Sequence, residues 1–380
     1  MSGPAAGTAH AATTTDVVCL GESMVTFLPS QPGRLADVPS FGRGIGGAES
    51  NVACALAAAG HRAAWVGRVG ADGFGDHLVE TIAGYGVDTS AVRRDPDRPT
   101  GIYFRTATDR GTGAHEVAYY RAGSAASAMS PANVPYEELF AGRILHLSGI
   151  TAALSADCLA LLRELTAPRP GRPLVSFDVN HRPRLWRDGD AGVLQELARR
   201  CDLVFVGEDE AEEAWGIVGA EAIRAALPEP SVVVVKRGSA GATVFASGPR
   251  PGPRSSNAGG ADSAAGGAEA GEGAAQAAGR DTVTVVPALH VDVVAAVGAG
   301  DAFAAGFLSA TLRGLPVRDR VRHGHLMAAA VLTVPGDLTE PPARDHADRL
   351  VALDDGAWGR LRLGPGWTAA DRAHEEVRTP

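Results

Sequence analysis

The chain has few cysteines, few long apolar runs and no excess of positive charge. Its four cysteines among 380 residues are scattered, without a CxxC pair or a histidine at ligand spacing: Cys19, Cys54, Cys158 and Cys201. This argues against a zinc site and predicts small buried thiols in a reducing compartment. The net charge of −9 argues against nucleic acid as the main partner.

Targeting and membrane-spanning patterns are also missing. No apolar run approaches the roughly 20 residues that a transmembrane helix needs, so a membrane partner is not expected. The start, MSGPAAGTAHAATTTD, has no basic region and no apolar core, unlike a secretory signal. We therefore predict a cytoplasmic protein, with residues 1–14 as a disordered arm.

Short apolar runs alternate with helical patterns over most of the chain. Helices are expected at 48–60, 158–166 and 191–200. Strands are expected at 16–21, 62–70, 143–149, 173–180, 202–208 and 231–238. Buried strands that alternate with amphipathic helices predict a parallel sheet with helices on both faces.

Three regions interrupt this alternation. Residues 101–122 alternate like a hairpin with a glycine-containing turn, which predicts antiparallel strands in a flap. Residues 247–281 are almost all Gly, Ala, Ser and Pro, and cannot bury enough surface to offset ordering entropy. We interpret them as a disordered insertion between two strands. Residues 351–380 show no pattern and are expected to form an irregular tail.

The stretch AAVGAGDAFAAGF, from Ala295 to Phe307, joins a glycine-rich turn to an apolar helix. Helix N-termini carry unpaired N–H groups and partial positive charge. Gly298 and Gly300 would let the backbone approach an anion closely. Asp301, in the first helical turn, is either a simple helix cap or a catalytic base.

A second stretch, GIGGAESN, also precedes a helix. Gly46 and Gly47 allow a tight strand-to-helix connection, and Asn51 lies in the first turns. Asn51 is either a solvated residue or faces the same cleft as Asp301.

Together, these stretches resemble the two signatures of the ribokinase-like (PfkB) sugar kinases. The first is GG-x-x-x-N at Gly46–Asn51, followed by G-x-x-G-x-D-x-x-G at Gly67–Gly75. The second is Gly298–Asp301 with its helix of small residues. The resemblance covers about residues 15–345. It implies a three-layer α/β/α sandwich with a mostly parallel central sheet and a small β lid, here parts of 22–45 and 97–125, in one kinase domain over 15–350.

The resemblance also implies transfer of the γ-phosphate of ATP to a sugar hydroxyl. Asp301 would accept the proton of the attacking hydroxyl late in the reaction, because an ordinary Asp, with a pKa near ~3.9, cannot ionise an alcohol beforehand. The turn of Gly298, Ala299 and Gly300 would present its amides to the moving phosphoryl group.

Three further segments resemble 2-keto-3-deoxygluconate kinases: TGIYF (100–104), AYYRAGSAAS (118–127) and FDVNHRPRLW (177–186). By that resemblance the substrate contacts, beyond Gly46, Gly47 and Asn51, would be Tyr103, Tyr119, Arg121 and Arg182. Arginine binds a carboxylate through a planar fork, which suits a sugar acid. The alternatives are hairpin packing for the tyrosines, an exposed strand position for Arg121 and a surface ion pair for Arg182.

The segment VVVKRGSAGATVF (232–245) resembles the family's strand–loop–strand beneath ATP. Lys236 would offer charge to the phosphates, and Gly238, Ser239 and Gly241 would form the loop. The alternative is a β-turn with a solvated lysine. The chain contains no GxxxxGK[ST] loop.

Two family features of ion binding are altered. The N-x-x-E associated with Mg²⁺ occurs as Gly207–Glu210, so Glu210 is the candidate metal-organising residue. Mg²⁺ keeps several waters and needs few protein ligands. The usual DTTGAGD has AAV at 295–297, which predicts no monovalent-cation site of the usual kind.

The sequence therefore predicts an ATP-dependent sugar kinase, most consistent with phosphorylation of 2-keto-3-deoxygluconate at its terminal hydroxyl to the 6-phosphate. The alternatives are a kinase for a neutral ketose, such as fructose or ribose, and a non-catalytic sugar-binding relative. A homodimer formed through the lid is left open.

Overall fold

The computed structural model describes residues 15–106, 116–186, 190–247 and 281–369. The predicted arm at 1–14, most of the predicted insertion (248–280), the turn of the predicted hairpin (107–115) and the last part of the predicted tail (370–380) lie outside this range.

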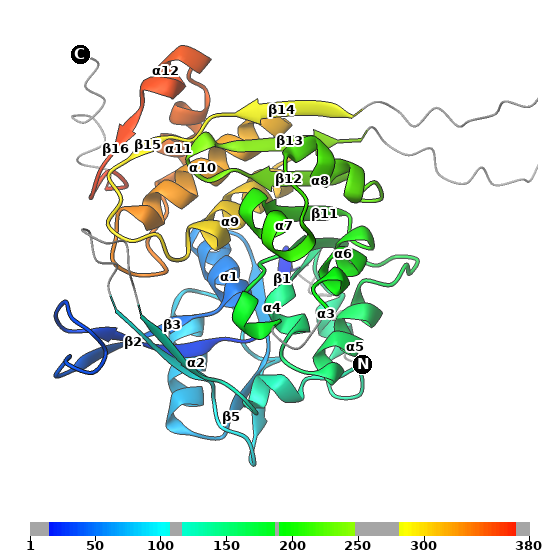
Figure 1. Ribbon diagram of the computed structural model, residues 1–380, viewed down its shortest axis with the longest axis vertical. Helices are drawn as coiled ribbons and strands as arrows, with labels where there is room; N and C mark the ends of the chain where they lie inside the picture. Colours follow the sequence, from blue (N-terminus) through cyan, green and yellow to red (C-terminus); the bar gives the residue numbers. More distant parts are fainter. Residues whose placement is uncertain (1–14, 107–115, 187–189, 248–280, 370–380) are drawn as a thin grey trace, which may run out of the picture.

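An eight-stranded sheet forms the centre of the molecule (Figure 1). Its strands, in spatial order, are β14 (Thr282–Val286), β13 (Ala242–Ala246), β12 (Val232–Lys236), β11 (Leu203–Gly207), β10 (Leu174–Asp178), β9 (Ile144–Ser148), β1 (Val17–Leu20) and β4 (Ala63–Val66). The strands from β12 to β4 run parallel, whereas β13 is antiparallel to both of its neighbours. The predicted, mostly parallel sheet is confirmed.

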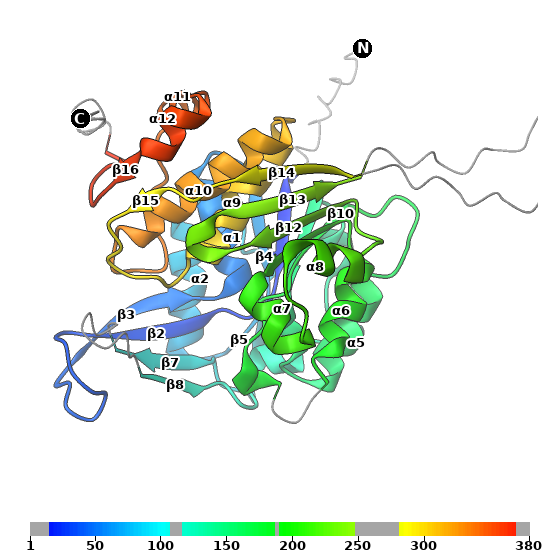
Figure 2. The same ribbon diagram turned by 45° about the horizontal axis from the view of Figure 1, so that its top comes forward.

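Helices cover both faces of this sheet (Figure 2). In β1, Val17 and Cys19 belong to one buried cluster, and Val18 and Leu20 belong to another, as the two-residue period of a strand requires. The first cluster includes residues from α1 (Ala48–Ala58), α9 (Ala299–Leu312), α10 (Val317–Leu332) and α11 (Arg344–Val351). The second includes residues from α5 (Ala156–Leu165), α6 (Gly192–Arg199) and α8 (Ala220–Ala226).

Small residues let the helices of the first layer pack closely. A side chain at Gly306 of α9 would bring its Cβ within 2.4 Å of the backbone oxygen of His323 in α10. The buried face of α1 is built mostly from Ala, Ser, Cys and Val. This close packing brings the N-terminal halves of α1 and α9 together, although they are far apart in the sequence.

A separate four-stranded sheet forms the lid (Figure 2). Its order is β3 (Phe41–Gly46), β2 (Met24–Pro29), β7 (Ile102–Arg105) and β8 (Val117–Tyr120). β7 and β8 are antiparallel, with Tyr103 opposite Tyr119. The aromatic rings of Phe27 and Phe104 stack at 4.6 Å between centroids.

The strand predicted at 62–70 is two strands. β4 joins the central sheet, whereas β5 (Arg68–Gly70) pairs with β6 (Arg93–Asp95) in a small sheet of its own. Gly67 separates them, and its Cβ would lie 2.6 Å from the ring of Trp65. The chain can change direction here because glycine has no side chain.

The tail predicted as irregular is partly ordered, so that prediction is wrong for residues 355–363. The chain forms α12 (Asp355–Arg360) and β16 (Arg362–Leu363), which pairs with β15 (His290–Val291). Buried Trp358 anchors this region, with the guanidinium of Arg322 4.5 Å from its ring. Such short elements depend on tertiary contacts and leave little periodicity in the sequence.

The remaining helices are α2 (Gly73–Gly84), α3 (Tyr136–Leu139), α4 (Gly149–Ala152), α7 (Glu208–Trp215) and the short 3₁₀ turns η1 (Ala125–Ala128), η2 (Pro183–Leu185) and η3 (Gly238–Ala240). Asp72 of the first signature caps α2 by accepting hydrogen bonds from the amides of Phe74 and Gly75. None of the helices in the described residues has the length and hydropathy to cross a bilayer.

Candidate active site

The candidate site lies at the carboxyl ends of the parallel strands, where open α/β sheets bind ligands. β10 ends at Asp178, β11 leads directly into α7, and β12 ends at Lys236. The turn that begins α9 faces these strand ends, since a side chain at Gly300 would bring its Cβ within 3.7 Å of Lys236 Nζ.

Asp301 and Asn51 meet across 250 positions of sequence. The Nδ2 of Asn51 donates a hydrogen bond of 2.8 Å to Asp301 Oδ2. Asn51 is only 4% exposed, so it is not a solvated residue. Asp301 lies in the first turn of α9, but no side chain caps this helix, whose N-cap is Gly298. The structure therefore does not support simple capping by Asp301, whose carboxylate is bound by Asn51 instead.

The surroundings of Asp301 raise its pKa to about 7. Burial is the largest cause, because it penalises the charged carboxylate, and the nearby Asp178 adds to the increase. The hydrogen bond from Asn51 and the positive charges of Arg182 and Lys236 oppose it. A carboxylate with this pKa can take up and release a proton near neutral pH, as a general base must.

The turn before Asp301 has a conformation that requires glycine. Gly298 has a φ of +80°, and a Cβ there would lie 2.5 Å from the backbone oxygen of Asp337. The first intrahelical hydrogen bond of α9 runs from Ala302 N to Gly298 O. The amides of Ala299, Gly300 and Asp301 therefore have no partner within the helix and can bind an anion.

Lys236 lies among carboxylates. Its Nζ is 3.0 and 3.1 Å from the two oxygens of Asp178 and 3.9 Å from Glu210 Oε2. Burial lowers the pKa of Lys236, but Asp178 and Glu210 raise it more, so the net change is an increase. Lys236 thus stays positively charged beside the α9 turn and is not a solvated turn lysine.

Sequence reasoning missed Asp178, although it quoted the segment that contains it. One signal was available in the printed sequence: Lys236 is the only lysine in the chain, beside 34 arginines. This single lysine therefore stands out at the end of an apolar strand. Its buried partner Asp178 could then have been sought at the end of a neighbouring strand.

The predicted nucleotide loop lies at the end of β12. Gly238 and Ser239 are exposed in η3, and Gly238 has a φ of +53°. Gly241 has a φ of +101°, and a Cβ there would lie 2.1 Å from the backbone oxygen of Val286. The loop therefore offers backbone to solvent close to the charge of Lys236.

Glu210 is held at the start of α7. Its Oε2 accepts a hydrogen bond of 2.7 Å from Gly207 N, and its Oε1 lies 3.6 Å from Arg182 Nη1. No cluster of three or more His, Cys, Asp or Glu residues with metal-ligand geometry occurs in the described part of the chain. A Mg²⁺ that keeps most of its waters and binds phosphate needs few protein ligands, and a lone carboxylate such as Glu210 suits such an ion.

On the lid side, Tyr103 is buried and points toward the body. Its hydroxyl donates a hydrogen bond of 3.2 Å to Asp337 Oδ2, and its ring centroid is 5.4 Å from that of Tyr119. A Cβ at Gly46 would lie 2.3 Å from the Tyr103 hydroxyl oxygen. Gly46 is therefore needed for the lid tyrosine to reach the cleft. Tyr119 is 44% exposed.

The two predicted substrate arginines differ in their surroundings. The side chain of Arg121 is 11% exposed and forms an ion pair with buried Glu22, which also accepts a hydrogen bond of 2.6 Å from Ser124 Oγ. Gly47 packs against the Glu22 backbone, since its Cβ would lie 2.4 Å from that oxygen. Arg182 is the N-cap residue of η2, and its side chain is 51% exposed. Of the two, Arg182 is the cation open to a ligand.

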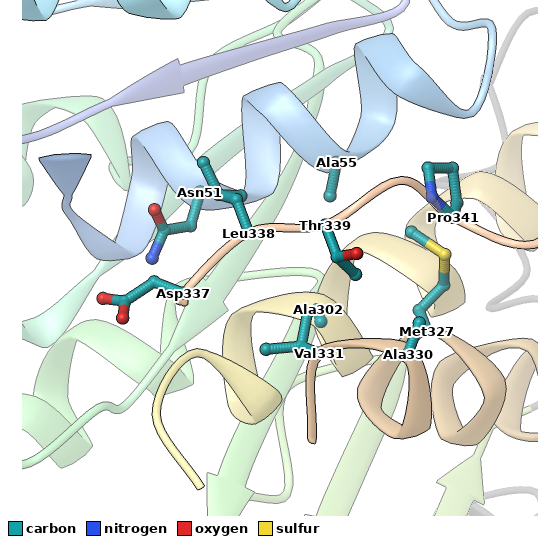
Figure 3. Close-up of a pocket in the computed structure, with 10 residues that line it drawn as sticks. All are labelled: Asn51, Ala55, Ala302, Met327, Ala330, Val331, Asp337, Leu338, Thr339 and Pro341. Carbon is teal, nitrogen blue, oxygen red and sulfur yellow. The ribbon is translucent and has the colours of Figure 1, made fainter. Parts of the chain in front are cut away.

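A small cavity lies between α1, α9, α10 and the segment 337–341 (Figure 3). Asn51 and Asp337 direct their polar groups to one end of it, whereas Ala55, Met327 and Pro341 line the rest. Sequence reasoning missed Asp337, because a lone acid in an irregular segment carries no local signal.

Comparison with known proteins agrees with this geometry. Residues 14–256 and 269–344 match the family described as pfkB family carbohydrate kinase. The chain is 34% identical to a 2-dehydro-3-deoxygluconokinase of Bacillus subtilis over 87% of this chain and 93% of that protein.

Two solved structures share the fold. A PfkB protein from Polaromonas sp. JS666 is 30% identical, with a TM-score of 0.70 over 88% of this chain and 99% of that one. A sugar kinase from Pyrococcus horikoshii, solved in complex with ATP, is 22% identical, with a TM-score of 0.69 over 87% of this chain and 96% of that one. The fold, the signatures and the family match agree, and the chain belongs to the pfkB family of carbohydrate kinases.

Proposed function

We propose that this chain transfers the γ-phosphate of ATP to the terminal hydroxyl of a sugar acid, 2-keto-3-deoxygluconate (2-dehydro-3-deoxygluconate), and yields its 6-phosphate. The observation that carries the proposal is the Asp301 carboxylate, which accepts a hydrogen bond from Asn51 at the start of α9. The similarity to a 2-dehydro-3-deoxygluconokinase supports the choice of sugar.

In the proposed mechanism, the sugar hydroxyl donates a hydrogen bond to Asp301. As its oxygen bonds to the γ-phosphorus, the bond from phosphorus to the bridging oxygen breaks, ADP leaves and Asp301 takes the proton. The amides of Ala299, Gly300 and Asp301 stabilise the charge on the transferring group, and one such donor is typically worth about 3–4 kcal/mol. Lys236 adds a positive charge held in place by Asp178.

The nucleotide loop of Gly238, Ser239 and Gly241 would lie along ATP. Mg²⁺ would neutralise phosphate charge when bound, and Glu210 would hold it through water. Residues 295–297 are Ala, Ala and Val and offer no side-chain ligand, so we propose that no monovalent-cation site of the usual kind exists here.

Sugar recognition is assigned to two sides of the cleft. Arg182 would bind the carboxylate, because it is the more exposed of the two candidate arginines. Tyr103 and Tyr119 of the lid would line one side of the sugar site. Gly46, Gly47 and Asn51 would also contact the sugar. Arg121 would contact the substrate beside its partner Glu22.

A substrate panel with ADP detection tests the proposal. The purified protein with ATP and Mg²⁺ should release ADP with 2-keto-3-deoxygluconate. Arg182→Gln should raise KM for this sugar about 10- to 100-fold, since a hydrogen bond to a charged group is worth roughly 1.5–3 kcal/mol. It should leave KM for ATP unchanged.

Arg184→Gln is the matched control, because Arg184 is a nearby exposed arginine that donates to the Val117 backbone of the lid. No ADP release with the sugar acid, together with turnover of fructose or ribose, would contradict the substrate assignment and favour a neutral ketose. No ADP release with any sugar, while the sugar still binds, would favour a non-catalytic relative.

We further propose a single kinase domain over 15–350 that acts in the cytoplasm, where ATP is supplied, without a nucleic-acid or membrane partner. A homodimer through the lid is supported by its aromatic outer face. Phe104 contacts Phe27, Phe41 and Tyr120, and Tyr120 is 65% exposed. Light scattering on Tyr120→Ser should show a shift from dimer to monomer, and an unshifted mass would contradict this interface.

A further inference from the structure

A buried ion pair joins the lid to the segment that follows α10. Arg105, the last residue of β7, places its Nη2 2.6 Å from Asp337 Oδ1. Their side chains are only 8% and 5% exposed, and 232 positions separate them in sequence. The same nitrogen donates to the backbone oxygen of Pro335 at 3.4 Å. None of the roles assigned above uses Arg105.

Asp337 also contacts the catalytic turn. Its backbone oxygen lies where a Cβ on Gly298 would be only 2.5 Å away, so the segment packs directly against the N-cap residue of α9. Its carboxylate accepts from Tyr103 of the lid and borders the small cavity beside Asn51 (Figure 3). Gly298 is the N-cap of α9, so one short segment touches the lid on one side and the start of the turn that carries Asp301 on the other.

The Nη2 of Arg105 suits this position. It donates both to the side chain of Asp337 and to the backbone of Pro335, so it fixes the segment at two points. The side chain of Arg105 is 8% exposed, and both of these contacts are with the protein itself. A buried charge also cannot readily lose its partner, so the lid strand and the segment are held together as a unit.

We propose that Arg105 is a positioning residue: by holding residues 335–337 against Gly298 when the lid is docked, it sets the geometry of the 298–301 turn. The inference rests on the proposed role of Asp301 and its turn, and not on the identity of the sugar. It assigns the lid a part in ordering the phosphate-binding turn, in addition to covering the sugar.

The test compares Arg105→Met and Arg105→Lys with Arg43→Met, which removes an exposed lid arginine on β3. Arg105→Met should lower kcat about 100-fold, the cost of a small misplacement of reacting groups, with KM for ATP within twofold of the wild type. Arg105→Lys keeps a positive charge on a shorter side chain without a guanidinium and should recover part of kcat. Arg43→Met should change neither constant.

Hydrogen exchange gives a second readout that needs no substrate. Peptides covering 294–303 should exchange faster in Arg105→Met than in the wild type and be unchanged in Arg43→Met. A kcat within twofold of the wild type, or unchanged exchange at 294–303, would overturn the proposal. A rise confined to KM for the sugar would also overturn it, since Arg105 would then bind substrate.

If Arg105→Met does not fold, Arg105→Lys carries the test, because it keeps the charge beside Asp337, and it should still lose about tenfold in kcat. A wild-type enzyme that turns over another sugar defeats the substrate part of the proposed function, but the Arg105 test can then be run with that sugar.

Discussion

The pKa of about 7 at Asp301 predicts an acid limb in the pH–rate profile. Only the ionised carboxylate can accept the proton of the sugar hydroxyl. Below about pH 7, kcat/KM should therefore fall tenfold for each pH unit and reach about one-hundredth of its plateau at pH 5. An Asp with an ordinary pKa near ~3.9 would give a flat profile over this range.

Replacing Asn51 with Ala should move this limb in a defined direction. The hydrogen bond from Asn51 favours the ionised carboxylate and so lowers the Asp301 pKa. Its loss is worth roughly 1.5–3 kcal/mol, and one pKa unit corresponds to about 1.4 kcal/mol. The limb should move about one to two units toward higher pH, whatever happens to the plateau rate.

The assay is kcat/KM for the sugar from pH 5 to 9, with saturating ATP and Mg²⁺. Because the nucleotide's own ionisation is the same in both proteins, the difference between the profiles isolates Asp301. Asn133→Ala removes an exposed asparagine whose side chain bonds to the backbone of Ala128 and Ser130, and it should leave the limb in place. A wild-type profile that is flat down to pH 5, or an Asn51→Ala limb at the wild-type position, would refute this reasoning.

Three further predictions follow from the same contacts. Asp301→Asn should lower kcat by about 10²- to 10⁴-fold. The pKa of Asp301 in the folded state lies above its unfolded value of 3.8, so ionisation destabilises the folded wild type as pH rises from about 4 to 7. The variant should therefore unfold at a higher temperature than the wild type at pH 8, but not at pH 4. Lys236→Met should lower kcat/KM and destabilise the fold by about 3 kcal/mol, because Asp178 keeps a buried charge without its cation. Adding Asp178→Asn should recover stability to urea but not the rate. Recovery of both would contradict the role of Lys236 in catalysis. Gly298→Ala should lower the free energy of unfolding more than Gly314→Ala does. Both glycines have a positive φ, but only at Gly298 would the new Cβ clash with a backbone atom, that of Asp337. Equal losses would show that the contact with Asp337 is unimportant.

Much of the fold could be predicted because its signals are local. Buried strands and amphipathic helices leave periodic patterns, and these predicted the sheet with helices on both faces. The prediction was wrong where stability comes from distant contacts. The tail at 355–363 is ordered by Trp358 against Arg322, and the stretch at 62–70 divides between two sheets at Gly67.

The site shows the same division. The sequence identified Asp301, Asn51 and Lys236, because glycine-rich helix starts and a charged residue after an apolar strand are visible without a structure. It did not identify Asp178 or Asp337, since each is a single acid whose partner is distant in the sequence.

The sequence by itself determined the family's fold and the local shape of the glycine-rich turn at 298–301, because glycine spacing and helix position depend on neighbouring residues. Only the tertiary structure decided whether Asp301 caps its helix or faces Asn51 across the cleft, and burial there raises its pKa to about 7. It likewise decided that Arg121 is paired with Glu22 and Arg105 with Asp337, whereas Arg182 remains exposed. Charge, burial and partner are properties of packing between distant segments, and no short stretch of sequence contains them.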